Sequence, residues 1–283
     1  MSVTASAVKE LRQRTGAGMM DCKKALVEAG GDMDEAIKIL RTKGLAAAAK
    51  KAHRAASEGL IAIAGDDHKA AMIELNCETD FVSRNSEFQE FARALVDQAL
   101  EAGAADVAAL KAQKFAADPE HTVEEAISQK IAKIGENIVL SRVALVEARD
   151  GARLASYVHM GGKIGVIVEG SDSLSKDVLR DVAMHIAAMD PRYASRDEVT
   201  DDILATEREI ALKQAMDQGK PEHIAERIVS GKMEKFYEEV VLMEQDFAKD
   251  GSKTVGQFVT ESGGEGATIY RFVRFKLGEE TGE

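Results

Sequence analysis

The chain has 283 residues, of which 45% are hydrophobic and 30% are charged, with three prolines and no tryptophan. This length permits two or three domains with a sizeable core, and the composition is typical of a globular protein. No apolar run reaches the length of a membrane span, so we expect no membrane partner. Cys22 and Cys77 are the only cysteines, which argues against a disulfide framework or a metal knuckle. The N-terminal residues lack signal-peptide features, so we expect a cytoplasmic protein.

The formal net charge of −12 is unevenly distributed. Residues 1–54 carry 11 basic and 6 acidic side chains, a charge of +5, which leaves −17 on the rest of the chain. A basic head on an acidic body favours electrostatic steering toward a partner with its own charge pattern. The basic excess is small and contains no interleaved aromatic residues, so we expect no direct nucleic-acid partner.

The first 54 residues predict a compact three-helix unit. A helix over residues 5–15 ends at Gly16-Ala17-Gly18, and a second helix ends at Gly30-Gly31. The pattern Asp32-x-x-Glu35 caps a third helix, and the alanine- and lysine-rich residues 45–54 continue as a linking helix.

From Glu58 the hydrophobic period changes to two, which indicates strands. Residues 60–63 and 71–75 flank a turn and predict a hairpin, and helices are expected near 87–101 and over 123–134, followed by a strand over 138–146. The pattern then recurs. A second hairpin over 154–158 and 164–168 precedes a helix over 177–188, and a shift of 94 residues lays Lys69 on Lys163 and Ile73 on Ile167. We therefore predict an α+β fold with two related antiparallel-sheet/helix subdomains.

Two charged, amphipathic segments, 200–219 and 222–239, predict an inserted antiparallel helical hairpin that projects from the body. Ile203, Leu204, Ile210 and Ala211 form its expected apolar stripe, and Pro221 suits the first turn of the second helix. A helix near 254–259 and a strand over 267–275 follow. The predicted domains are 1–54, 55–147, 148–192 plus 240–283, and the hairpin 193–239.

The string Glu74-Leu-Asn-Cys-Glu-Thr-Asp-Phe-Val-Ser-Arg84 places Asp80 and Phe81 where a strand gives way to a helix. Ser86-x-x-Gln89 predicts a capping box at that helix start. Two interpretations of the pair stay open. Phe81 either packs beneath the helix while Asp80 caps a turn, or it points outward, since Phe88 and Phe91 already supply aromatic residues for the helix.

No pattern in the sequence predicts catalysis, a bound metal or a cofactor. Gly251-Ser-Lys253-Thr254 has the wrong order for a phosphate loop, and Gly161-Gly-Lys163 is better explained as a hairpin turn. The six histidines show no metal-ligand spacing. His159, beside a turn, is either an exposed turn residue or a partner contact, whereas His185 is expected to be structural. Met20 is either core or an adaptable contact.

Two long strings resemble signatures of the translation elongation factor Ts family. The first is Leu11-Arg-Gln-Arg-Thr-Gly-Ala-Gly-Met-Met-Asp-Cys-Lys-Lys-Ala-Leu26, and the second is the string that ends at Arg84. The paired subdomains, the helical hairpin and Ser252-Lys-Thr-Val-Gly-Gln257 also resemble that family, so the resemblance covers essentially the whole chain. It implies a guanine-nucleotide exchange factor for elongation factor Tu, acting in translation elongation without covalent chemistry.

The resemblance also implies roles for particular residues. The N-terminal unit resembles a ubiquitin-associated three-helix domain that docks on the GTPase, and His159 matches a strand-end histidine that touches the partner. The matching residues of the N-terminal unit are Arg12, Met19 and Met20. The segment that dislodges Mg²⁺ from the partner corresponds to Thr79, Asp80, Phe81 and Val82. Phe81 would wedge between helices of the GTPase, and Asp80 would disturb the network that supports the ion.

Two other functions stay open: a scaffold that only stores or stabilises the GTPase, and a nucleic-acid-binding protein that uses the basic head. Self-association through the helical hairpin is also possible. Some members of the family continue into a C-terminal helix that contacts the GTPase. Because the printed sequence stops at Glu283, we expect exchange to depend more on the N-terminal unit and on Asp80 and Phe81.

Overall fold

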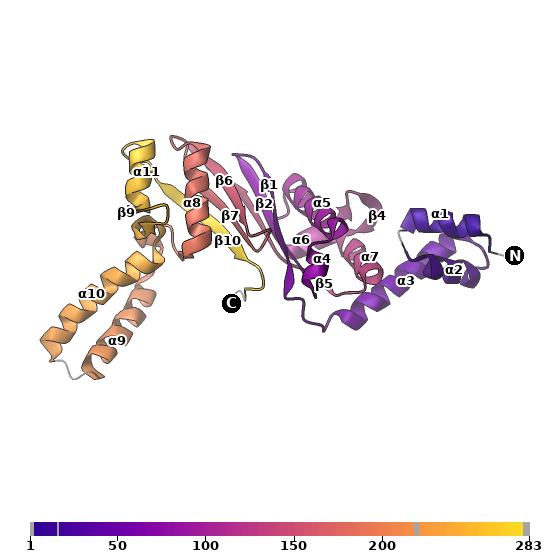
Figure 1. Cartoon of the computed structure of the whole chain (residues 1–283), viewed down its shortest axis with the longest axis horizontal. Helices are drawn as coiled ribbons and strands as arrows, with labels where there is room; N and C mark the ends of the chain where they lie inside the picture. Colours follow the sequence, from indigo (N-terminus) through magenta and orange to yellow (C-terminus); the bar gives the residue numbers. More distant parts are fainter. Residues whose placement is uncertain (1–2, 16, 218–220, 280–283) are drawn as a thin grey trace.

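The computed structural model describes residues 3–15, 17–217 and 221–279. Helices and antiparallel sheets share the chain, which confirms the predicted α+β class. The molecule is elongated: the N-terminal helices lie at one end, two sheets occupy the middle, and a helical hairpin projects from the other end (Figure 1). The division into four domains stays a prediction.

The N-terminal unit consists of α1 (Ala5–Thr15), α2 (Met19–Glu28) and α3 (Met33–Lys51). Its small core contains Val8, Leu11, Cys22, Ala25, Leu26 and Ala36. Asp32 caps α3 as predicted, because its Oδ1 accepts the Glu35 N–H at 2.8 Å. The expected linking helix is present as a continuation of α3, which runs unbroken to Lys51 and packs against α7 at Gly44.

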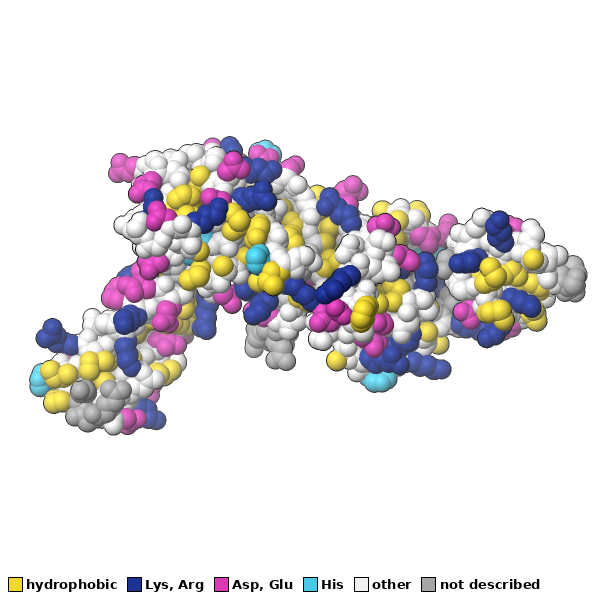
Figure 2. Space-filling view, viewed as in Figure 1, with side chains coloured by type: hydrophobic (Ala, Val, Ile, Leu, Met, Phe, Trp, Pro, Cys, Tyr) yellow, Lys and Arg dark blue, Asp and Glu magenta, His cyan; other side chains and the backbone are white. Residues whose placement is uncertain are grey.

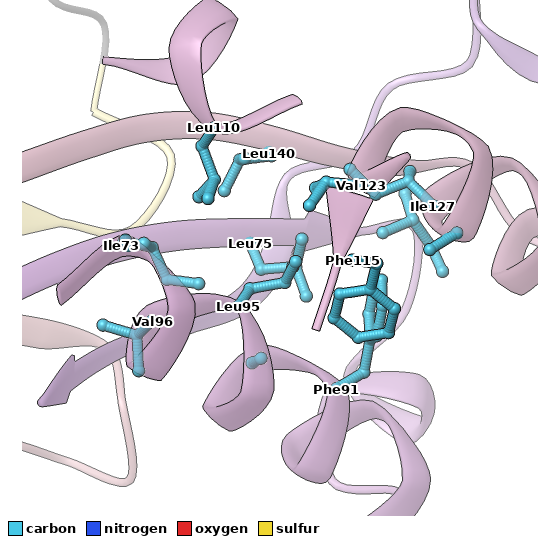
Figure 3. Close-up of a cluster of buried hydrophobic side chains, with 14 of the residues drawn as sticks. Ile73, Leu75, Phe91, Leu95, Val96, Leu110, Phe115, Val123, Ile127 and Leu140 are labelled. Carbon is cyan, nitrogen blue, oxygen red and sulfur yellow. The ribbon is translucent and has the colours of Figure 1, made fainter. Parts of the chain in front are cut away.

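The first sheet has the order β1-β2-β5, with all neighbours antiparallel. Its strands are β1 (Glu58–Gly65), β2 (Lys69–Cys77) and β5 (Ile138–Glu147). The segments between β2 and β5 are α4 (Asp80–Ser83), α5 (Ser86–Ala102), α6 (Val107–Ala112), β3 (Lys114–Phe115), β4 (Asp118–Thr122) and α7 (Val123–Ile134). Figure 3 shows the core that they share, in which Leu75 of β2 and Leu95 of α5 lie close to Phe91 and Phe115.

The second sheet has the order β10-β7-β6 and is also antiparallel. Its strands are β6 (Ala152–His159), β7 (Ile164–Ser171) and β10 (Ile269–Lys276). The remaining elements are α8 (Lys176–Met189), the 3₁₀ turns Arg196–Glu198 and Leu242–Glu244, α9 (Asp201–Asp217), α10 (Glu222–Val240), β8 (Asp246–Phe247), β9 (Asp250–Thr254) and α11 (Val255–Gly263). Both predicted hairpins are therefore present.

The internal repeat extends further than the hairpins. Thr122 and Glu125 form a capping box at α7, and Thr254 and Gln257 form the same box at α11. Each box follows a short two-stranded ribbon, β3-β4 or β8-β9. The offset here is 132 residues, against 94 for the hairpins. The helices α9 and α10 lie between the two matching regions of the second half, which accounts for the larger offset.

The two helices α9 and α10 form the predicted hairpin, but its apolar seam differs from the expected stripe. Ile210 is 45% exposed and therefore lies outside the seam. Among the side chains of the two helices that the structure describes, the buried ones are Ala211, Ala215, Ala225, Val229, Met233 and Val240. Pro221 is the N-cap of α10 rather than a residue of its first turn, and residues 219–220 of the predicted break lie outside the described residues. Self-association through the hairpin stays a prediction.

His185 of α8 has a structural role, as expected, and the repeat explains it. Its Nδ1 accepts the Ala248 N–H at 3.1 Å, so its Nε2 carries the proton and donates to Gln245 Oε1 at 2.9 Å. In the first half Gln98 makes the same two bonds through its amide, to the Ala116 N–H at 2.9 Å and to Gln113 Oε1 at 3.1 Å. A neutral imidazole thus replaces an amide.

The presence of a histidine at this position makes the free energy of unfolding depend on pH. Burial lowers the pKa of His185 below its ordinary 6.5, although the bond to Gln245 opposes that shift. In the unfolded chain the His185 imidazole therefore becomes protonated near pH 6.5, whereas in the folded protein it becomes protonated only at a lower pH. The resulting loss of unfolding free energy begins below pH 6.5 and approaches at most about 1.4 kcal/mol per pH unit.

We predict that His185→Gln removes this contribution, because glutamine can make both bonds without titrating. Urea unfolding between pH 7.5 and pH 5 would measure it. The exposed His53→Gln is the matched control and is expected to keep the wild-type slope. Identical slopes for wild type and His185→Gln would contradict the prediction.

Candidate functional site

The segment that follows β2 forms a single helical turn, α4. Thr79 precedes it with extended backbone, and its Oγ1 accepts the Val82 N–H at 3.5 Å. A four-residue helix has too few internal hydrogen bonds to be stable alone. Its position therefore depends on contacts with the rest of the protein.

Phe81 points outward from this turn, with 84% of its surface exposed. The alternative in which the ring packs beneath α5 is wrong, because Phe88 and Phe91 fill that core. Asp80 does not act as a cap but is the first residue of α4, and its carboxylate pairs with Arg84 at 3.1 Å. Val82 packs against the core and anchors the turn on its inner side.

The predicted capping box at Ser86 is wrong, and the helix start is tied to α4 in another way. Asn85 is the cap of α5, and its Oδ1 accepts the Glu87 N–H at 2.8 Å. Gln89 does not reach back to the cap but donates from Nε2 to the Ser83 carbonyl at 3.3 Å. Asparagine is as good a cap as serine, so the sequence alone gave no reason to prefer one residue over its neighbour.

Glu136 also contacts the turn, although nothing in the sequence pattern singled it out. Its Oε2 accepts the N–H groups of Glu78 and Thr79 at 3.1 and 3.0 Å, and its Oε1 accepts the Thr79 hydroxyl at 2.7 Å. Glu136 lies 57 residues from Thr79 in the chain. The contact arises only because β5, which begins two residues later, pairs with β2.

A second set of exposed apolar side chains lies on the N-terminal unit. Met19 and Met20 at the start of α2 are 54% and 61% exposed, so Met20 is not a core residue. Arg12 of α1 is also exposed. Figure 2 shows hydrophobic side chains gathered at this end of the molecule between basic and acidic ones. Exposed methionines suit an adaptable contact surface.

The third predicted position, His159, is the last residue of β6 and is partly buried. Its Nδ1 is hydrogen-bonded to the Tyr157 hydroxyl at 2.8 Å, which fixes the ring. Val158 and Met160 flank it with 43% and 70% exposure. No pattern in the sequence singled out these two neighbours, although an apolar residue beside Gly161-Gly162 in a turn is a signal that could have identified Met160.

Within the part of the chain that the structure describes, no group of three or more His, Cys, Asp or Glu side chains could hold a metal ion. Burial, reinforced by the Glu136 carboxylate, raises the pKa of the Cys77 thiol to about 12. Cys77 therefore stays protonated and donates to the Thr79 carbonyl at 3.2 Å. None of the helices described is long and apolar enough to cross a membrane.

Comparison with known proteins decides the family. The model of the family "Elongation factor TS" matches residues 78–279. The chain is 45% identical to Elongation factor Ts of Trichlorobacter lovleyi over 292 residues, covering 99% of this chain and 94% of that protein. The chain belongs to the elongation factor Ts family. Membership confirms the resemblance and makes the chain a nucleotide exchange factor for elongation factor Tu in translation elongation. Such a factor catalyses no covalent chemistry.

The exposure of Phe81 leads to a prediction about stability. Phe81→Ala is expected to change the free energy of unfolding by no more than about 0.5 kcal/mol, because the ring contributes little to the core. Phe88→Ala, at a fully buried ring of the neighbouring helix, is the matched control, with an expected loss of about 3–5 kcal/mol. Chemical denaturation of both variants would test it, and comparable losses would contradict it.

Proposed function

We propose that the turn Thr79–Val82 carries out nucleotide exchange by entering the GTPase domain of elongation factor Tu and dislodging Mg²⁺. The observation that carries this proposal is the 84% exposure of Phe81 on an anchored turn. Water disfavours an exposed aromatic ring, and burial of such a ring in a partner contributes about 1.5–3 kcal/mol. That energy is available to separate elements of the partner that hold the ion.

The chemistry of nucleotide binding explains why loss of Mg²⁺ speeds release. A GTPase holds the phosphates of GDP through its phosphate-binding loop and the metal ion, which neutralise their charge. Phe81 acts as the wedge, and the carboxylate of Asp80 disturbs the polar network that supports the ion. Once the metal has moved, the diphosphate charge is poorly compensated, so GDP dissociates without any bond being broken.

The other candidate residues serve as contacts that hold the partner. Arg12, Met19 and Met20 bind the GTPase domain from the N-terminal unit, and His159 binds it from the end of β6. These contacts supply affinity that does not depend on the nucleotide. Val158 and Met160, which flank His159, extend that surface.

Thermodynamic linkage explains how the exchange factor is released from elongation factor Tu at the end of the exchange cycle. If the exchange factor weakens nucleotide binding by a given ratio, nucleotide weakens binding of the factor by the same ratio. GTP therefore releases the factor when it enters the empty site, and mass action determines the direction.

We predict that Phe81→Ala slows release of labelled GDP from elongation factor Tu by at least about tenfold, the loss expected when a buried interface aromatic is truncated. Asp80→Asn is expected to slow release less, since it keeps the shape of the turn and removes only its charge. Stopped-flow fluorescence measures both rates. Ile210→Ala, at an exposed hydrophobic position of α9, is the control and is expected to match wild type.

Chelation of Mg²⁺ separates the proposal from a scaffold role. With the metal removed, GDP leaves quickly without help, so wild type and Phe81→Ala are expected to give equal rates. An unchanged rate for Phe81→Ala in the presence of Mg²⁺ would refute the wedge. A difference that persists under chelation would show that the ring acts on something other than the ion.

A further inference from the structure

We infer that Glu136 is a positioning residue for exchange: its carboxylate sets the direction in which Phe81 leaves the protein. This inference rests on the proposed role of the Phe81 turn and adds a residue that acts through it.

The carboxylate of Glu136 binds the two residues at which the chain turns from β2 into α4. One oxygen accepts both backbone N–H groups of Glu78 and Thr79, and the other accepts the hydroxyl of Thr79. With its proton donated to Glu136, the Thr79 hydroxyl is left to accept the Val82 N–H. The capping residue Thr79 and the backbone that leads into α4 therefore depend on one side chain.

Glu136 is itself held on both sides. It follows Gly135, which ends α7 in the left-handed conformation with φ 91°. The next residue, Asn137, donates its N–H to Glu78 Oε1 at 2.7 Å and its Nδ2 to the Arg54 carbonyl at 2.9 Å. The two strand ends thus exchange carboxylate-to-backbone bonds in both directions, Glu136 to Glu78 and Glu78 to Asn137.

This arrangement has a mechanical consequence. The end of α7 and the chain at Arg54 both connect to the turn, so a force on Phe81 is carried into the body of the protein. Without the anchor, a one-turn helix would rotate under load, and the ring would lose its direction while the other contacts persist. The partner would still bind, but GDP would leave more slowly.

The bonds predict an unusual order among substitutions. Glu136→Gln keeps the length of the side chain and one carbonyl oxygen for the two N–H groups, and its NH₂ can donate to Thr79 Oγ1. Glu136→Asp keeps the charge but is one methylene too short to reach the turn. Positioning therefore predicts that glutamine retains exchange and aspartate loses it, whereas an electrostatic effect of Glu136 on the partner's metal predicts the reverse.

The experiment measures GDP release from elongation factor Tu by stopped-flow fluorescence, together with the affinity for the partner. We expect Glu136→Asp to slow release by about tenfold, the effect of losing hydrogen bonds to a charged group, with affinity changed much less. Glu136→Gln is expected to stay within about twofold of wild type, since it keeps the acceptors. Glu198→Asp is the matched control, because that carboxylate accepts the Ala194 N–H at 2.7 Å far along the chain from α4.

Two additional variants separate this inference from the proposed function. If Phe81→Ala leaves release unchanged, the proposed function fails. If Phe81→Ala slows release and Glu136→Asp does not, only the positioning role fails. Because Glu136 acts through the turn that carries both Phe81 and Asp80, its effect and that of Phe81 are expected not to add. The double variant Glu136→Asp/Phe81→Ala is expected to be slower than Phe81→Ala by much less than the roughly tenfold effect of Glu136→Asp alone, and fully additive losses would overturn the inference.

Amide hydrogen exchange of the free protein gives a readout without the partner. Glu136→Asp is expected to speed exchange at Glu78, Thr79 and Val82 while protection across β1 and β2 is retained. Unchanged exchange at these three amides, or a glutamine variant as slow in GDP release as the aspartate variant, would contradict a positioning role.

Discussion

The two sheets pack closely against each other, and this contact fixes how the two halves of the protein are arranged. The Ile61 N–H of β1 donates to the Gly162 carbonyl at 2.8 Å, across the boundary between the halves. At Gly165 a Cβ would lie 2.5 Å from Ile61 Cγ2 and 2.8 Å from the sulfur of Met72, so only glycine permits this contact. An apolar cluster with residues from both sheets surrounds this contact. The halves therefore pack as one body, so the surfaces at His159 and at Phe81, where we propose that the partner binds, keep a fixed separation.

Each half also buries one carboxylate on its central strand, and these carboxylates join the C-terminal part of the chain to the sheets. Glu74 of β2 binds Arg142 at 2.6 Å and accepts the Gly278 N–H at 2.8 Å. Glu169 of β7 pairs with Arg271 and Arg149. Burial opposes its ionisation, yet the bonds from these two arginines keep the pKa of Glu169 below its ordinary value. These charges are compensated by hydrogen bonds, as buried carboxylates must be.

The sequence predicted the features that depend on local periodicity and turn chemistry. The helix over 123–134 was found with its boundaries, and both hairpins were found because alternating strands flank glycine-containing turns. Features that depend on competition between near-equal local choices were missed. Asn85 rather than Ser86 caps α5, and the seam of α9 selects Ala211 and Ala215 over Ile210, because the facing surface of α10 decides which side of the helix is covered.

Candidate site residues could be selected from the sequence where they lie in contiguous strings, and their role stays a prediction. Asp80 and Phe81 stand in one motif, but the direction of the ring could not follow from it, since both a buried and an exposed phenylalanine agree with the pattern. The contact of Glu136 with this turn could not be predicted from the sequence, for a different reason. It meets Thr79 only through the pairing of β2 with β5, a contact between residues 57 apart that no local period encodes.

The repeat provides an argument that the exposed ring is not a requirement of the fold. In the second half only residues 172–175 join β7 to α8, and the apolar residue of that connection, Leu174, is fully buried and packs into the core. In the first half residues 78–85 join β2 to α5, which leaves room for the extra turn α4. In the second half the short connection thus completes the core without an exposed aromatic residue. The longer connection in the other half carries Phe81 into solvent on the turn that follows the bonds from Glu136 to Glu78 and Thr79. An exposed ring on such a turn is the arrangement expected of a part that serves contact with a partner rather than stability.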